Sequence, residues 1–211
     1  MSRCFLVRHG ATAWNARGRI QGQSNPSLNE AGKRQARRLG MRLASVPFAE
    51  APCSDLRRCS ETAAGILQGR NDVPLREMPE LREKNFGAWE GLTFREVEVA
   101  YPDLYRNWLR AGDPSFAPPG GESDLQLYCR AETVVDRLRA ALADSDANLL
   151  VVTHGGMLRA LIARLLDLPA QRMWNFRFAN AGLSVVSLFE DGSAVVDLLN
   201  DTSHLGEGFG E

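Results

Sequence analysis

Two apolar runs constrain the fold of this chain more than any other feature of its sequence. Phe5-Leu6-Val7 leads into Arg8-His9-Gly10, and Leu149-Leu150-Val151-Val152 leads into Thr153-His154-Gly155. Continuous apolar runs of this kind are typical of strands that are buried on both faces of a parallel sheet. Ligands of open α/β sheets bind beyond the carboxyl ends of the strands. We therefore expect His9 and His154, two of the three histidines, to lie at the same end of one sheet.

The composition limits the class of protein. A chain of 211 residues with 44% apolar residues is most simply one α/β domain with a small insertion. Its formal net charge of −1 provides no overall field for nucleic acid or a membrane surface, and we expect neither as a partner. No apolar run reaches the roughly 18 residues of a membrane span, and no signal peptide is expected.

The four cysteines favour a reducing compartment. They show no CxxC spacing, and Cys4 and Cys53 lie in apolar stretches, where a reduced thiol packs as a small hydrophobic group. We therefore expect a cytoplasmic protein without structural disulfides.

Helical and strand patterns alternate between the two apolar runs. Ser54-Asp55 is expected to cap one helix, and the patterns Thr93–Glu96 and Ser123–Gln126 are capping boxes that begin two more. The predicted helices and strands between the runs are helix 29–46, strand 48–53, helix 55–67, strand 74–76, helices within 93–110, and helix 123–142.

Three segments complete the predicted organisation. Residues 183–189 and 193–199 form a hairpin around Asp191-Gly192, which predicts an antiparallel edge on a mostly parallel sheet. Residues 92–121 are predicted to be a small helical lid inserted within a single domain that spans residues 1–200. Residues 201–211 are predicted to be a flexible tail, and His204 within it is given no function.

Polar groups gather around the expected strand ends. The loop from Ala11 to Gly22 carries Asn15 and Gln21, whose amides suit an anion, although a solvated surface loop is an equally good interpretation. Arg57 and Arg58 begin a helix, where a cation opposes the macrodipole unless an anion is near. Consecutive helical residues point about 100° apart, so at most one of the two arginines faces the site.

A carboxyl group is expected nearby. Glu80, Glu83 and Glu90 share a loop with Phe86 and Trp89, and desolvation by aromatic side chains raises the pKa of a carboxyl towards that of a general acid. The residues alone do not choose among the three.

Several kinds of chemistry fit poorly. Zinc is disfavoured because the histidines form no HxxxH or HxH pair and Arg8 would repel the cation, while the chain has neither a P-loop nor a GxSxG elbow. Converging cationic and neutral donors instead suit a phosphoryl group. A neutral imidazole, favoured by neighbouring arginines, can attack it. The second histidine, if protonated, would stabilise the phosphoryl oxygens, and a glutamic acid would protonate the leaving group and then activate water.

The stretch from Arg8 to Asn15 resembles the RHG-x-T-x-x-N signature of the histidine phosphatase (phosphoglycerate mutase-like) superfamily. Further parts of the family pattern are matched by Ser54–Arg58, Leu81–Glu83, Phe86–Gly91, Gly120–Ser123 and Thr153–Gly156. The resemblance implies a three-layer α/β/α sandwich around a mostly parallel six-stranded sheet with an antiparallel edge strand.

The resemblance also implies roles for particular residues. His9 would be the phosphorylated nucleophile and Glu83 the acid/base. The implied phosphate-binding residues are Arg8, Asn15, Gln21, Gly22, Arg58, His154 and Gly155. It implies no metal and no cofactor. The partner would be a small phosphorylated metabolite, and a homodimer is left open.

Hydrolysis is the favoured reaction within this family. The 92–121 segment is shorter than in typical phosphoglycerate mutases and has no adjacent arginine pair, because Arg95, Arg106 and Arg110 are separated. Residues 85–91 and 168–177 are similar to the α-ribazole phosphatase branch of cobalamin biosynthesis, and broad-specificity phosphatases are close to it. A cofactor-dependent phosphoglycerate mutase is one alternative. A non-catalytic phosphoryl-binding domain is another, although such domains typically lack the nucleophile or the acid, and both are present here.

Overall fold

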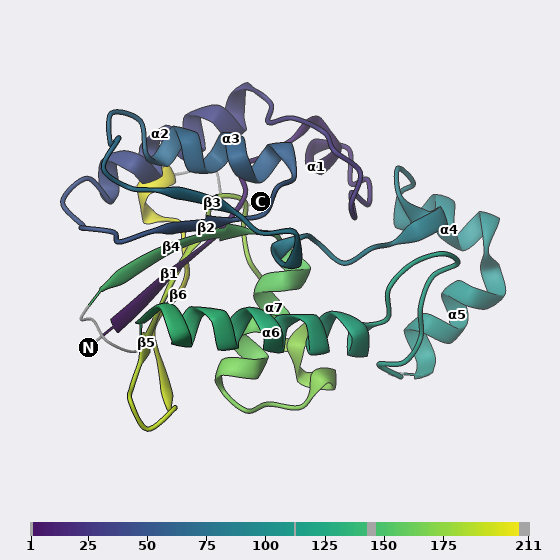
Figure 1. The fold of residues 1–211 in the computed structure, drawn as a ribbon. Helices are drawn as coiled ribbons and strands as arrows, with labels where there is room; N and C mark the ends of the chain where they lie inside the picture. Colours follow the sequence, from purple (N-terminus) through teal and green to yellow (C-terminus); the bar gives the residue numbers. More distant parts are fainter. Residues whose placement is uncertain (1, 112, 143–146, 207–211) are drawn as a thin grey trace.

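A computed structural model describes residues 2–111, 113–142 and 147–206 and is built around a six-stranded sheet (Figure 1). The strand order is β3-β2-β4-β1-β5-β6. The strands β1, β4, β2 and β3 run parallel to one another, whereas β5 runs antiparallel to β1 and β6, so the expected sheet is confirmed. The strands are β1 (Ser2–Arg8), β2 (Ala51–Cys53), β3 (Leu75–Glu77), β4 (Asn148–Thr153), β5 (Leu183–Leu188) and β6 (Ala194–Asp201).

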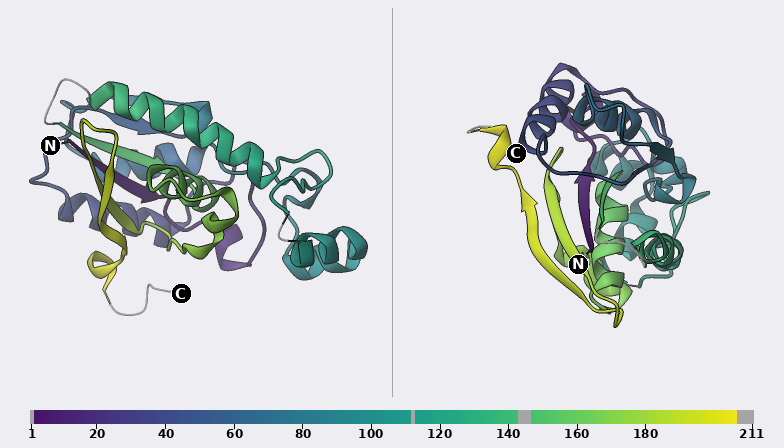
Figure 2. Two further views of the ribbon diagram at one scale, coloured as in Figure 1. Left: turned by 90° about the horizontal axis from the view of Figure 1, so that it is seen from below. Right: turned by 60° about the vertical axis from the view of Figure 1, so that its left-hand side comes forward.

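The helices cover both faces of the sheet (Figures 1 and 2). The pair α2 and α3 lies on one face and the pair α6 and α7 on the other, which gives three layers. The helices of the described ranges are α1 (Ala13–Ala16), α2 (Glu30–Arg42), α3 (Arg57–Ile66), α4 (Phe94–Ala100), α5 (Pro102–Ala111), α6 (Asp124–Leu142) and α7 (Gly155–Leu165). None of them combines the length and the apolar character that crossing a membrane requires.

The central strands bury side chains in both directions, as the two apolar runs predict. Leu6 and Val151 pack towards α6 and α7, whereas Val7 and Val152 pack towards α2 and α3. All four side chains are fully buried, and each contributes about 1.5–3 kcal/mol of hydrophobic stabilisation. This two-sided burial explains why neither run alternates with polar residues.

The register of β1 and β4 positions the two histidines. Arg8 lies opposite Thr153 in the parallel pair, and the N–H of His9 donates to the Thr153 carbonyl over 2.9 Å. His154 follows directly and is the N-cap residue of α7. Both histidines therefore leave neighbouring strands at the same end of the sheet.

The helices α4 and α5 lie beyond the carboxyl ends of the strands, at the right of Figure 1. Thr93 and Glu96 form the predicted capping box at the start of α4. The segment packs on its own aromatic cluster, in which the rings of Trp89 and Trp108 are 5.8 Å apart and edge-on.

The predicted flexible tail is wrong for residues 201–206. The strand β6 continues through Asp201, and a 3₁₀ turn follows at Ser203–Leu205. Leu205 is fully buried, and Arg38 of α2 donates to its carbonyl. Figure 2 shows this turn, in yellow, beside α2. Residues 207–211 lie outside the described ranges.

Candidate active site

The two histidines lie together at the carboxyl ends of β1 and β4. Their ring centroids are 5.2 Å apart, and the ring planes are inclined at 61°. His9 is 2% exposed, and His154 is fully buried. The prediction that the two histidines lie at the same end of one sheet is therefore confirmed.

The hydrogen bonds of His9 determine which ring nitrogen is available. Nδ1 donates to the Gly10 carbonyl oxygen over 2.8 Å, so the lone pair of the neutral ring lies on Nε2. Burial, followed by the charges of Arg58 and Arg8, lowers the pKa of His9 well below its usual value. His9 is therefore neutral and has a free nucleophilic nitrogen.

Gly10 allows the chain after His9 to press against α2. A Cβ at Gly10 would lie 2.7 Å from the Gly32 carbonyl oxygen, which is closer than side-chain carbons approach. The Gly10 N–H donates to Oγ1 of Thr62 over 3.0 Å. The loop that carries His9 is thus fixed against α2 and α3.

Arg58 is the member of the arginine pair that enters the site. Its Nη1 and Nη2 donate to the carbonyls of Ser24 and Gly22, both over 2.7 Å. Its Nε donates to Nδ1 of His154 over 3.2 Å. Arg58 is fully buried, whereas Arg57 is exposed, as the 100° rotation between helical neighbours requires.

The predicted cap of α3 is wrong. The N-cap residue is Leu56, which offers no side-chain hydrogen bond. The Asp55 carboxylate instead accepts from Arg82, with Nε to Oδ1 at 2.7 Å. The guanidinium of Arg82, from a loop distant in sequence, thus binds the carboxylate that would otherwise have accepted from the first N–H groups of the helix.

Arg8 has one donor in use and one without a partner. Nη1 donates to the Phe178 carbonyl over 2.6 Å, while the buried Nε has no hydrogen-bond partner among the described residues. Burial lowers the pKa of Arg8 to about 10, so the guanidinium remains charged at neutral pH. A buried charged donor without a partner suits an anionic ligand.

Asn15 and Gln21 contribute neutral donors. The Thr12 N–H donates to Oδ1 of Asn15 over 3.0 Å, and the Thr12 hydroxyl lies 3.1 Å from Oε1 of Gln21. Thr12 therefore occupies both amide carbonyls, which leaves the NH₂ groups to donate to a ligand. Gly22 has a φ of +49°, and a Cβ there would collide with the Glu90 carboxylate.

The Glu83 carboxylate is held in place through both oxygens. Oε1 accepts from the Lys84 N–H over 2.9 Å, and Oε2 accepts from the Gly156 N–H in the first turn of α7 over 3.1 Å. Arg130 of α6 holds the preceding backbone by donating to the carbonyls of Glu80 and Arg82. Glu83 therefore has a fixed position on the cavity wall.

The structure distinguishes Glu83 from the other two candidate acids. Glu80 forms an ion pair with Arg137, with nitrogen and oxygen 3.0 Å apart. Glu90 accepts from the backbone N–H groups of Gln23 and Ser24, both over 2.8 Å, and so holds the loop around Gly22. Of the three, only Glu83 lines the cavity.

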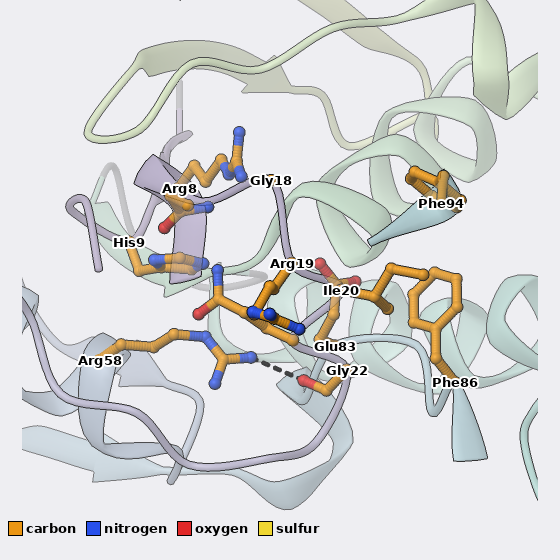
Figure 3. Close-up of a pocket in the computed structure, with 12 residues that line it drawn as sticks. Arg8, His9, Gly18, Arg19, Ile20, Gly22, Arg58, Glu83, Phe86 and Phe94 are labelled. Carbon is orange, nitrogen blue, oxygen red and sulfur yellow. Dashed lines mark hydrogen bonds between the residues drawn. The ribbon is translucent and has the colours of Figure 1, made fainter. Parts of the chain in front are cut away.

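The cavity has a cationic half and an apolar half (Figure 3). Arg8, His9 and Arg58 point inward from one side, and Ile20, Phe86 and Phe94 form the other. The cavity is lined by Arg8, His9, Asn15, Gly18, Arg19, Ile20, Gln21, Gly22, Arg58, Glu83, Phe86 and Phe94. The lining residues that were not among the predicted site residues are Gly18, Arg19, Ile20, Phe86 and Phe94.

The cavity residues that were not predicted differ in how strong a signal the sequence offered for them. Phe94 directly follows the capping residue Thr93, and a large apolar side chain at this position of a surface helix is a signal that the sequence offered. In the structure, Phe94 is 41% exposed. Ile20 and Arg19 gave no such signal. Nη1 of Arg19 lies 3.1 Å from Oε2 of Glu96 and also donates to the Gly91 carbonyl.

His154 and Gly155 lie behind the cavity wall, and neither is among its lining residues. Nδ1 of His154 accepts from Arg58, and Nε2 lies 2.8 Å from Oγ of Ser54. Burial, followed by the charge of Arg58, lowers the pKa of His154 well below its usual value. Its predicted role in stabilising phosphoryl oxygens was conditional on a protonated ring, and the lowered pKa favours the neutral ring instead. Gly155 lies against the Arg8 side chain.

The donor groups of the site suit an oxyanion. The buried Arg58, the half-buried Arg8 and two amides surround a neutral imidazole, with one carboxylate at the border of the apolar half. Within the described ranges, no three His, Cys, Asp or Glu side chains gather as a group that could hold a metal ion. Fixed donors around a nucleophile are what phosphoryl transfer requires of a protein.

The comparison with known families agrees with this geometry. Residues 4–202 match the family model of the histidine phosphatase superfamily (branch 1), and the chain belongs to that family. It is a phosphatase, a hydrolase of phosphoric monoesters.

Three relatives place the chain more closely within the family. It is 38% identical to the adenosylcobalamin/alpha-ribazole phosphatase of Salmonella typhimurium, over 94% of this chain and 96% of that protein. It is 35% identical to a metal-independent phosphoserine phosphatase of Arabidopsis thaliana, over 95% of this chain and 82% of that protein. The alpha-ribazole phosphatase of Shigella flexneri has a similar structure, with a TM-score of 0.87, 33% identity and coverage of 94% and 96% of the two chains.

Proposed function

We propose that the protein hydrolyses phosphomonoesters through a phosphohistidine at Nε2 of His9, without a metal. The hydrogen bond from Nδ1 of His9 to the Gly10 carbonyl carries this proposal, because it leaves the lone pair on Nε2. The lowered pKa of His9 supports it further, since attack requires the neutral ring.

The first step forms the covalent intermediate. Nε2 of His9 attacks phosphorus, the bond between phosphorus and the ester oxygen breaks, and the leaving oxygen takes a proton from the Glu83 carboxyl group. Arg8 and Arg58 balance the charge on the phosphoryl oxygens. The position of Glu83 between the two halves of the cavity supports this role, because the leaving group must cross that border (Figure 3).

The second step returns the enzyme to its starting state. The Glu83 carboxylate takes a proton from water, the water oxygen attacks phosphorus, and the bond between phosphorus and Nε2 breaks. Inorganic phosphate leaves, and Glu83 is again protonated. General acid and base catalysis of this kind contributes about 10²- to 10⁴-fold.

The substrate that we propose is α-ribazole 5′-phosphate. The relatives from Salmonella typhimurium and Shigella flexneri support this choice by their described activity. The apolar half of the cavity supports it chemically, because Phe86 and Phe94 offer aromatic surface to the heterocyclic base of such a leaving group. The ring of Phe94 is itself stacked on Trp108, with centroids 5.4 Å apart. The 92–121 segment therefore supplies part of the substrate wall, which supports its predicted role as a cover.

Phosphoserine is the second candidate, because the Arabidopsis thaliana relative is a phosphoserine phosphatase. Its carboxylate would need a cation outside the phosphoryl half. Arg19 is the one lining arginine besides Arg8 and Arg58, and its guanidinium already binds Glu96 and the Gly91 carbonyl. The aromatic wall therefore favours α-ribazole 5′-phosphate.

We also propose that the protein works in the cytoplasm. Its four cysteines are free thiols, and Cys4, Cys53 and Cys59 are buried. Free thiols persist where the compartment is reducing.

The reaction is tested with p-nitrophenyl phosphate, with and without a chelator, for the natural protein and for His9→Ala. We expect turnover that the chelator leaves unchanged. After a rapid quench, the natural protein should carry a base-stable phosphoryl group, and His9→Ala should carry none. Phosphate binding without turnover would identify a non-catalytic domain. Loss of activity with the chelator would overturn the metal-free mechanism.

The substrate is tested by comparing kcat/KM for α-ribazole 5′-phosphate, phosphoserine and 3-phosphoglycerate. We expect the first to exceed the other two by at least about tenfold, the discrimination that about 1.4 kcal/mol of apolar contact provides. A preference for phosphoserine would overturn the substrate proposal and leave the reaction intact. Isomerisation of 3-phosphoglycerate that outruns its hydrolysis would identify a mutase.

A further inference from the structure

The third histidine contacts the loop behind the nucleophile. His204 lies in the 3₁₀ turn after β6, and its Nε2 donates to the Ala181 carbonyl oxygen over 3.0 Å. Its Nδ1 accepts from Nη1 of Arg42 over 3.3 Å. A carbonyl can only accept and a guanidinium can only donate, so the two partners fix the proton on Nε2. Burial lowers the pKa of His204 and thereby favours the neutral ring that both hydrogen bonds need.

Ala181 connects this histidine to the backbone of the nucleophile. Its N–H donates to the carbonyls of both Arg8 and His9, at 3.0 Å and 3.2 Å. Ala181 is fully buried and has a φ of +53°, in the left-handed region that a residue with a Cβ enters at a cost. Such a conformation persists only where surrounding contacts hold it. The contact from His204 is made directly to this residue.

The rest of the 179–182 turn is tied to the same two places. On the side of the nucleophile, Nδ2 of Asn180 donates to the His9 carbonyl over 3.0 Å. On the side of the C-terminal segment, Oδ1 of Asn200 accepts from the Ala179 N–H over 2.7 Å. Asn200 is also left-handed, with a φ of +50°. The 179–182 turn therefore joins the C-terminal segment to the end of β1.

We propose that His204 is a positioning residue for the reaction at His9. It touches neither the cavity nor the substrate, and it acts by holding the left-handed Ala181, whose N–H fixes the carbonyls at the end of β1. A displacement of a reacting group by about 1 Å costs up to about 100-fold in rate. Because Arg58 belongs to α3 and is held by His154, Ser24 and Gly22 rather than by the 179–182 turn, binding of the phosphoryl group is largely retained when the turn relaxes. The expected signature is a lower kcat with KM nearly unchanged.

Three variants test this role with p-nitrophenyl phosphate, a substrate that does not depend on the identity of the natural one. His204→Ala removes the donor, and we expect kcat to fall about tenfold with KM within about twofold of its original value. His204→Gln keeps an N–H donor of similar reach and should recover most of the loss. Ser203→Ala is the matched control, because it removes the 2.7 Å hydrogen bond from Arg42 to the same turn without touching Ala181.

The outcomes are separable by measuring kcat, KM and the melting temperature of each variant. The proposal is overturned if His204→Ala keeps its kcat, if Ser203→Ala loses as much as His204→Ala, or if Gln restores nothing. If His204→Ala does not fold, His204→Gln is compared with His204→Asn, whose shorter side chain cannot reach the Ala181 carbonyl. Equal kcat values for these two variants overturn the proposal. This inference rests on the proposed reaction at His9: absence of a phosphoenzyme in the natural protein would overturn that reaction, whereas the outcomes above overturn the role of His204 alone.

Discussion

Nε of Arg58 donates a hydrogen bond to Nδ1 of His154 over 3.2 Å, and this bond decides the protonation of the second histidine. While Nδ1 accepts, the proton of the neutral ring lies on Nε2, which then donates to Oγ of Ser54 over 2.8 Å. In this structure His154 therefore orients Arg58. It can bind an anion itself only after one of these bonds is exchanged.

The two adjacent arginines of α3 should differ sharply when each is replaced by lysine. Arg58→Lys loses the planar donor set that contacts His154, Ser24 and Gly22 at once. We expect kcat/KM for p-nitrophenyl phosphate to fall about 10- to 100-fold, the effect of losing one charged hydrogen bond of about 1.5–3 kcal/mol. Arg57→Lys is the control and should change kcat/KM less than about twofold. Equal losses of kcat/KM in Arg58→Lys and Arg57→Lys would contradict a role for Arg58 in the site.

Glu83→Gln should reveal the proton donor through its dependence on the leaving group. An alkyl phosphate needs protonation of its leaving oxygen, so we expect its kcat to fall about 10²- to 10⁴-fold. The phosphoenzyme should form from p-nitrophenyl phosphate with a much smaller loss, because p-nitrophenolate leaves without a proton. The control is Glu80→Gln, which removes only the ion pair with Arg137. The same loss in phosphoenzyme formation for both substrates would contradict an acid role for Glu83.

Folding stability should decrease as the pH falls below about 6.5. The pKa values of His9, His154 and His204 are lowered in the folded protein, so the unfolded chain binds more protons in this range. Each histidine should cost about 1.4 kcal/mol per pH unit, from about 6.5 down to its own lowered pKa. Urea unfolding between pH 8 and pH 5 measures this slope above the range in which most carboxylates titrate. In His9→Gln this slope of stability against pH should be smaller by the contribution of one histidine. An unchanged slope would show that His9 is charged in the folded protein.

Asp124 should be more important for stability than an exposed carboxylate. Oδ1 of Asp124 binds the Lys84 ammonium, whose side chain is 1% exposed, and Oδ2 accepts from Nε1 of Trp174 over 2.6 Å. Asp124→Ala leaves this buried charge unpaired, which costs about 3–5 kcal/mol. The double variant with Lys84→Met should recover most of that loss in urea unfolding. Asp103→Ala, which breaks an exposed pair with Arg106, should cost less than about 1 kcal/mol. A double variant no more stable than Asp124→Ala would contradict this explanation.

The sequence predicted the elements whose signal is local. The runs that end at His9 and His154 are apolar because both of their faces are buried, and this pattern also predicted that they share one parallel sheet. That the two strands are neighbours is seen only in the structure. The capping box at Thr93 follows from four consecutive residues and is present. Periodicity limited the choice between Arg57 and Arg58 to one residue, the family resemblance pointed to Arg58, and the packing of α3 shows that Arg58 turns inward.

The features that the sequence did not predict depend on contacts between distant segments. Asp55 fails to cap α3 because Arg82 binds it, and no local pattern links these two residues. The C-terminal turn is ordered because Arg38 and Arg42 of α2 bind it, although its glycine-rich composition suggested a tail. Phe94 reaches the cavity only because α4 folds back beyond the strand ends.

The helix α4 contributes Phe94 to the cavity, whereas the groups that face the phosphoryl oxygens come from the sheet ends, from α1 and α3 and from the adjoining loops. In the proposed mechanism, the groups that break the ester bond are thus encoded apart from this part of the wall that meets the leaving group. An ancestor with this scaffold could acquire new metabolites by exchanging one peripheral helix while its hydrolytic machinery stayed untouched. Diversification of this kind requires no intermediate that has lost the ability to cleave a phosphate ester.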